Sequence, residues 1–154
     1  MRERLLHSVW TPRVTVAAVI EQQQKFLLVE ELEAGRKVLN QPAGHLEEGE
    51  SLLQAVVRET LEETGRDLQP VAITGLYRWA WAEKNLTFLR LAVCGQVSEP
   101  LPGRTIDDDI IGWRWVGVEE LRADPTQLRS PLVLTCIEDY LKGQRYPLDL
   151  LIDL

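Results

Sequence analysis

Three glutamates near the middle of the chain are the residues best suited to chemistry. Glu59, Glu62 and Glu63 have the i, i+3, i+4 spacing that places side chains on one face of a helix. Carboxylates this close repel one another, so all three can be ionised only with a cation among them. Oxygen ligands with an incomplete protein shell suit Mg²⁺, with Mn²⁺ as a possible substitute, that takes up substrate phosphates. The simpler interpretation is a solvated acidic helix face.

Two further charged residues lie close to these glutamates in the sequence. Arg58 lies at the edge of the acidic face, where its guanidinium can hold a carboxylate through two parallel hydrogen bonds. Glu50 lies in the preceding loop, where it can orient the groups that bind metal without binding metal itself. We therefore expect Glu59, Glu62, Arg58 and Glu50 to be catalytic, and Glu59, Glu62 and Glu63 to bind metal.

The helix that must position these groups is predicted over Leu52–Thr64, which contains no Gly or Pro. Ser51 can cap it, and Gln54 three residues later completes a capping-box pattern. Gly65 is placed to end it. The side of the helix opposite the glutamates should face a core. That side carries Leu53, Val57, Thr60 and Leu61.

Aromatic and basic side chains outside the helix are candidates for substrate binding. Tyr77, Trp79 and Trp81 alternate along one expected strand and so point to the same side. Trp79 and Trp81 can stack on a planar ring, or the three can form a core-facing stripe. Arg90 on the next strand can bind phosphate, although a surface salt bridge is its commoner use.

A second acidic cluster, Asp107, Asp108 and Asp109, is expected in a late loop. It is either solvated or supplies one further acid that binds metal or positions water. His45 is a possible proton donor, although a histidine in a polar loop more often only bonds the backbone.

The composition is that of a globular protein, and we expect one domain over residues 1–154 with an N-terminal extension at 1–11. The net charge of −7 argues against binding nucleic acid or an anionic membrane surface. No apolar run approaches the length of a membrane span. Cys94 and Cys136 are expected to be buried free thiols, which suits the cytoplasm.

The rest of the chain predicts several strands and a late helix, arranged as mixed α+β layers. Ser130 and Pro131 should begin a helix that runs to Lys142. Residues 40–44 are expected to form a constrained loop, because Pro42 and Gly44 disfavour a central strand. The predicted strands are Val14–Ile20, Lys25–Glu31, Arg36–Leu39, Leu68–Trp81, Thr87–Val97 and Trp113–Gly117, with a short helix at Val118–Leu121.

The spacing from Gly44 to Gly65 resembles the Nudix box. Gly44 is followed by five residues and Glu50, then by seven residues and Arg58-Glu59, with Glu62-Glu63 and Gly65 in place. The resemblance implies a Nudix α/β/α sandwich with a mixed sheet, and the main-chain carbonyl of Gly44 as a further metal ligand. Thr60 and Arg66 depart from the pattern, at positions where the family has hydrophobic residues.

Outside the box, the chain resembles the NudJ subgroup of bacterial Nudix phosphatases. The similar segments are Asn40–Glu47, Leu128–Val133 and Gly143–Leu148. The resemblance implies Mg²⁺-dependent hydrolysis of nucleoside tri- and diphosphates, of hydroxymethylpyrimidine pyrophosphate and of thiamine pyrophosphate, releasing inorganic phosphate. The substrate partner is then a small phosphoanhydride, and the protein a monomer or homodimer.

Two alternatives remain open. One is a Nudix pyrophosphohydrolase for ADP-ribose or dinucleoside polyphosphates. Those groups carry a Pro or Tyr about fifteen residues past the box, where this chain has Ala80-Trp81-Ala82. The other is a Nudix-fold binding module without catalysis, which the complete set of box carboxylates disfavours.

Overall fold

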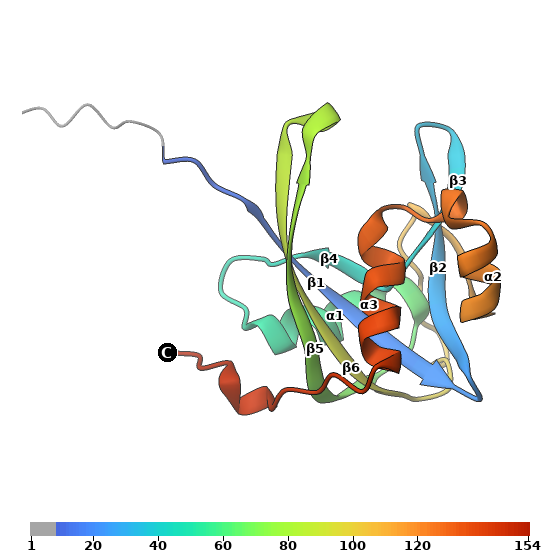
Figure 1. The fold of residues 1–154 in the computed structure, drawn as a ribbon. Helices are drawn as coiled ribbons and strands as arrows, with labels where there is room; N and C mark the ends of the chain where they lie inside the picture. Colours follow the sequence, from blue (N-terminus) through green and yellow to red (C-terminus); the bar gives the residue numbers. More distant parts are fainter. Residues whose placement is uncertain (1–8) are drawn as a thin grey trace, which may run out of the picture.

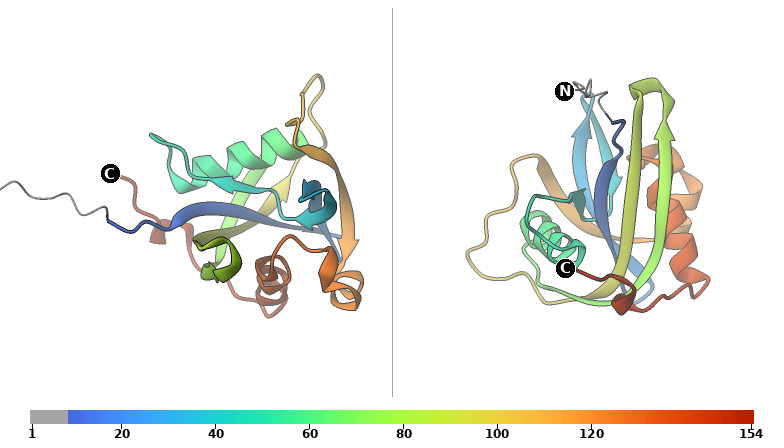
Figure 2. Two further views of the ribbon diagram at one scale, coloured as in Figure 1. Left: turned by 90° about the horizontal axis from the view of Figure 1, so that it is seen from above. Right: turned by 90° about the vertical axis from the view of Figure 1, so that its left-hand side faces the viewer.

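The computed structural model describes residues 9–154 and shows helices on both faces of a mixed sheet (Figures 1 and 2). The expected N-terminal extension falls, up to residue 8, outside the described residues. The strands are β1 (Arg13–Gln22), β2 (Lys25–Glu33), β3 (Arg36–Asn40), β4 (Ala43–His45), β5 (Leu68–Trp81), β6 (Leu86–Val97) and β7 (Ile110–Gly117). The α-helices are α1 (Leu52–Thr64), α2 (Val118–Ala123) and α3 (Pro131–Leu141).

The strand order is β3-β2-β1-β6-β5, with β4 paired to β1 and β7 paired to β2. β1 and β6 are parallel, and the other pairs are antiparallel. β1 and β2 pair only next to their connecting turn, at residues 21–26. Beyond that point the two strands separate, so β4 lies on β1 while β3 lies on β2. This separation leaves room for a cleft between the two halves of the sheet.

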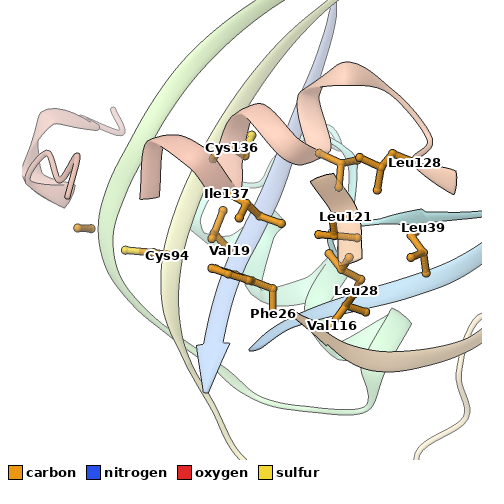
Figure 3. Close-up of a cluster of buried hydrophobic side chains, with 13 residues drawn as sticks. Val19, Phe26, Leu28, Leu39, Cys94, Val116, Leu121, Leu128, Cys136 and Ile137 are labelled. Atoms are coloured by element: carbon orange, nitrogen blue, oxygen red, sulfur yellow. The ribbon is translucent and has the colours of Figure 1, made fainter. Parts of the chain in front are cut away.

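Helix α1 covers one face of the sheet, and α2 and α3 cover the other (Figure 2, left). β1 is buried on both faces because its apolar side chains alternate between two cores. Val16, Ala18 and Ile20 contact the core under α1, whereas Val19 contacts the core under α3. Figure 3 shows the core under α3, in which Ile137 of α3 packs near Val19.

The local signals in the sequence place most elements correctly. Ser51 caps α1 in a full capping box with Gln54, and Gly65 ends the helix in the left-handed conformation. Ser130 caps α3, and Pro131 occupies its first turn. Two predictions were wrong. The expected loop at 40–44 contains β4, because residues 43–45 pair with residues 15–17 of β1. β7 begins at Ile110 rather than Trp113, because it pairs with β2 that far.

The two cysteines are buried, and the C-terminal segment pairs with the edge of the sheet. Cys94 and Cys136 are free and buried, as expected. Tyr146 exchanges two backbone hydrogen bonds of 2.8 Å with Ile73 and so extends the edge of β5. No helix within residues 9–154 is long and apolar enough to span a membrane.

Arg66 occupies a position where a hydrophobic residue was expected, and it is 4% exposed. Its guanidinium carbon lies 4.5 Å from the ring centroid of Trp113 and 5.5 Å from that of Trp115. One nitrogen donates to the carbonyl of Ser98 at 3.1 Å, and Nε has no partner among the described residues. The arginine therefore packs as an apolar stem with a cation held on two aromatic faces.

We expect Arg66→Ala to lower the free energy of unfolding by about 2 kcal/mol, because both the packing of the stem and the cation–π contacts are lost. Arg66→Met should cost about 1 kcal/mol or less, since it keeps a long apolar stem and removes an unpaired buried N–H. Urea unfolding measures both values. The exposed Arg78 supplies the control Arg78→Met, and an Ala variant as stable as that control would contradict this role.

Candidate active site

Helix α1 buries two of its glutamates as well as the side that was expected to face a core. Glu59 and Glu63 are 9% and 6% exposed. Leu53 and Val57 are partly buried and pack against the core under α1, as predicted, and Leu61 is partly buried. The expected inward position of Thr60 is confirmed: it is fully buried, and its hydroxyl donates to the carbonyl of Val56 at 2.8 Å. The fully buried apolar residues of the helix are Ala55 and Val56. The reason is that α1 packs against both β1 and β4, which brings the glutamates against β4.

Gly44 permits this close approach. A Cβ atom at position 44 would lie 2.1 Å from Oε1 of Glu59, which is a severe overlap. Next to it, the backbone N–H of Ala43 donates to Oε1 of Glu63 at 2.7 Å. The backbone of β4 thus contacts two of the three glutamates directly.

Arg58 joins the loop before α1 to the acidic face. Its Nε and Nη2 donate to the two oxygens of Glu50 at 2.9 and 2.7 Å. Its Nη1 donates to Glu59 at 2.8 Å and to Glu62 at 3.2 Å. Nη2 also donates to the carbonyl of His45 at 3.0 Å. The predicted bidentate contact is present, and its partner is Glu50.

The buried carboxylates hold their protons unusually firmly. Burial raises the pKa of Glu59 to about 7 and the pKa of Glu63 to about 9. Burial, with Asp109 and Asp108 nearby, also raises the pKa of Asp107. Burial is the largest cause of each shift, and neighbouring carboxylates add to it, whereas Arg58 and the backbone N–H of Ala43 act in the opposite direction. A divalent cation would lower all three pKa values.

The residues present fit Mg²⁺ in their chemistry. Among residues 9–154, no three acidic, histidine or cysteine side chains form a ready-made metal cage. Arg58 donates to one oxygen of Glu59 and one oxygen of Glu62, and the backbone N–H of Ala43 donates to one oxygen of Glu63. Mg²⁺ needs no such cage, because it keeps several waters and commonly binds one or two carboxylates together with substrate phosphates.

These residues line one cleft of about 490 Å³. Asp107 and Asp109 from the loop before β7 also line it, and the backbone N–H of Asp107 donates to the carbonyl of Glu62 at 3.0 Å. Asp108 is exposed and does not line the cleft. The side chain of His45 lines it as well, and burial lowers the pKa of this imidazole.

The three aromatic residues of β5 divide between core and cleft. Tyr77 packs against the core under α3, and its hydroxyl donates to Asp139 at 2.8 Å. Trp79 and Trp81 line the cleft and stack on each other with ring centroids 5.2 Å apart. Trp79 also stacks on Phe88 of β6 at 5.7 Å. The aromatic surface of the cleft is therefore a row of three rings rather than two separate tryptophans.

Arg90 was expected to make a surface salt bridge, and this was wrong. It is 5% exposed, lines the cleft, and donates to the side-chain oxygens of Gln41 at 2.9 Å and Asn40 at 3.3 Å. The prediction failed because β6 lies inside the sheet, between β1 and β5, so a residue on its α3 face is covered.

Several lining residues were not singled out from the sequence. Arg129 and Glu31 both line the cleft and form an ion pair at 2.7 Å, and the backbone N–H of Arg129 donates to the carbonyl of Leu39 at 2.9 Å. Arg129 lies in the segment Leu128–Val133, whose similarity to the NudJ subgroup was the available signal. The missed lining residues are Thr15, Glu31, Asn40, Ala43, Glu47, Phe88, Arg129, Ser130 and Leu132.

Comparison with known proteins agrees with this geometry. The NUDIX domain family model matches residues 11–134. The chain belongs to the Nudix family. Phosphatase NudJ from Escherichia coli strain K12 is 42% identical over 145 residues, which are 94% of each chain.

Solved structures support the same assignment. A NUDIX hydrolase from Nitrosomonas europaea has 50% sequence identity and a TM-score of 0.90, covering 94% of this chain and 98% of that one. The MutT NUDIX hydrolase from Burkholderia pseudomallei shares the fold, with a TM-score of 0.68 at 20% identity over 84% of this chain and 98% of that one. The chain is a Nudix hydrolase with the expected sandwich fold.

We expect Gly44→Ala to abolish stabilisation by Mg²⁺, because the new methyl group displaces Glu59. At a Mg²⁺ concentration 100 times the Kd, binding should stabilise the native enzyme by about 2.7 kcal/mol. Thermal unfolding with Mg²⁺ and with EDTA measures this difference. Gly117→Ala is the matched control, since Gly117 has φ −74 and open space around a Cβ. A Gly44→Ala protein that Mg²⁺ stabilises as strongly as this control would contradict the assignment.

Proposed function

We propose that this Nudix hydrolase catalyses Mg²⁺-dependent hydrolysis of phosphoanhydride bonds in nucleoside tri- and diphosphates and in thiamine-related pyrophosphates, releasing inorganic phosphate. The observation that carries the proposal is the acidic cluster of Glu59, Glu62 and Glu63 in the same cleft as the aromatic row. A phosphate-binding end and a ring-binding end in one cleft suit a small molecule that has both groups. Phosphatase NudJ, at 42% identity over nearly the whole chain, supports the phosphate-releasing form of the reaction.

The acidic residues would hold the metal. Glu59, Glu62 and Glu63, with the main-chain carbonyl of Gly44, would bind Mg²⁺, which would neutralise charge on the phosphate oxygens. Arg58 keeps Glu59 and Glu62 in place while Glu50 fixes its guanidinium from the other side. One of these carboxylates, or Asp107 or Asp109, positions and deprotonates the attacking water. Most of the rate enhancement then comes from fixed charges and fixed positions.

The alternative substrates, ADP-ribose and dinucleoside polyphosphates, have less support. The structural neighbours whose names mention ADP compounds or ADP-ribose are 23% identical or less, so they show only the shared fold. A binding module without catalysis is also disfavoured, because Arg58 and all four glutamates of the box are in mutual contact or share the cleft.

We expect Glu63→Gln to lower kcat/KM by at least about 100-fold, which is about 3 kcal/mol of transition-state stabilisation. The fold should survive, because glutamine keeps an oxygen that can accept from Ala43. Steady-state phosphate release at saturating Mg²⁺ measures the effect. Glu48→Gln is the control, since Glu48 is exposed and outside the cleft. Near-native turnover by Glu63→Gln would contradict the proposed role of this residue.

The reaction itself is tested by product analysis on nucleoside di- and triphosphates, thiamine pyrophosphate and ADP-ribose. Each is incubated with Mg²⁺ or with EDTA, and the products are separated chromatographically. We expect inorganic phosphate, released only with metal. Cleavage of ADP-ribose to a nucleoside monophosphate and a sugar phosphate, with no other substrate turned over, would replace the proposed reaction. Binding without turnover of any substrate would favour the binding module.

A further inference from the structure

Arg90 is a buried arginine that forms no salt bridge within residues 9–154. The two oxygens that accept from its guanidinium, those of Gln41 and Asn40, belong to neutral amides. Its Nε has no hydrogen-bond partner within residues 9–154. The thiol of Cys136 lies nearby and is neutral, because burial raises its pKa. A buried charge whose hydrogen-bond partners are all neutral is costly, so it indicates a group that is completed by a ligand.

A comparison with Arg66 shows why this is unusual. Both arginines are about 95% buried, and in both Nε lacks a partner. Arg66 lies over two tryptophan rings, whose faces attract its charge, and it does not line the cleft. Arg90 lines the cleft, where its charge faces the space a substrate would fill.

The surroundings of Arg90 hold it rigidly. Gln41 donates from its own Nε2 to the carbonyl of Val133 at 2.8 Å, so its oxygen is fixed for Arg90. Asn40 uses its oxygen for Arg90, which leaves its amide nitrogen as a donor at the same wall of the cleft. A guanidinium and an amide N–H₂ side by side present only donors. They suit a ligand edge that carries two adjacent acceptors.

The sheet register places this donor pair beside the aromatic row. Tyr77 is opposite Arg90 and Trp79 is opposite Phe88 across β5 and β6, so Arg90 and the stacked rings share one face. On the other side, Arg90 is in register with Thr15 of β1, and Thr15 with His45 of β4. At about 4.8 Å between strands, Arg90 lies roughly 10 Å from β4, where the acidic cluster begins. A ring against the aromatic row can therefore meet Arg90 while its phosphates reach β4.

We propose that Arg90 and Asn40 form a specificity site that selects planar heterocycles with two adjacent hydrogen-bond acceptors on one edge. The inference rests on the proposed function and names the substrate feature that this end of the cleft recognises. Guanine has such an edge in O6 and N7, whereas adenine has an amino donor beside N7.

The test compares kcat/KM for guanosine diphosphate, adenosine diphosphate and inorganic tripolyphosphate, which has no ring. We expect the native enzyme to prefer the guanine compound about ten- to a hundredfold. Asn40→Asp replaces the donor with an acceptor, and Arg90→Met removes the guanidinium. Arg90→Met should bring the ratio of the guanine to the adenine compound close to one, and Asn40→Asp should bring it to one or below, because a carboxylate can accept from the amino group of adenine. Arg78→Met, an exposed arginine on the neighbouring strand, should keep the native ratio.

Direct binding separates this inference from the proposed reaction. Calorimetric Kd values for the two diphosphates, measured in the Glu63→Gln background, should show the same preference without turnover. If this preference holds while the native enzyme hydrolyses none of the substrates, the proposed reaction is defeated but the specificity site is supported. Should Arg90→Met fail to fold, Asn40→Asp carries the test, since aspartate has the shape of asparagine and supplies a counter-charge to Arg90. Equal affinity for both bases in the native cleft, or an equal loss on all three substrates in Asn40→Asp, would overturn the inference.

Discussion

The site depends on the hydrogen bonds that Arg58 makes with carboxylates on both sides of it. Taking a carboxylate out of water costs several kcal/mol unless it is paired and hydrogen-bonded. Glu59 can lie at 9% exposure because Nη1 of Arg58 donates to it, while Glu50 holds the opposite edge of the same guanidinium. Since Arg58 also bonds the carbonyl of His45, one side chain ties the loop, β4 and α1 together. The conformation of the loop and the positions of the carboxylates therefore depend on each other.

β4 divides the cleft into its two functions. Successive residues of a strand point to opposite faces, so Gly44 lies against Glu59 while His45 shares a face with Thr15 and Arg90. The short strand thus separates the acidic end, on the α1 side, from the aromatic and donor-lined end, on the α3 side. This arrangement is possible because β1 and β2 separate after a brief pairing, which leaves β4 to cover only part of the gap.

The two departures from the box pattern are accommodated by different means. Thr60 satisfies its hydroxyl within its own helix, on the carbonyl of Val56, and needs no other partner. Arg66 uses aromatic faces that come from β7, in a part of the chain far from the box. Neither side chain lines the cleft, so both substitutions affect packing and leave the acidic cluster unchanged. In this chain the departures from the box pattern therefore lie among its packing residues and not in its acidic cluster.

The sequence by itself determined what depends on neighbours along the chain. The capping of α1 by Ser51, its end at Gly65, and the common face of the three glutamates all follow from local spacing. Tertiary structure decided that Glu59 and Glu63 are buried, because that depends on β4, whose pairing with β1 joins residues about thirty positions apart. It also decided that Arg90 is buried and that Phe88 completes the aromatic row, since both depend on which strands flank β6. Long-range pairing leaves little trace in local composition, and the cleft is assembled from such pairings.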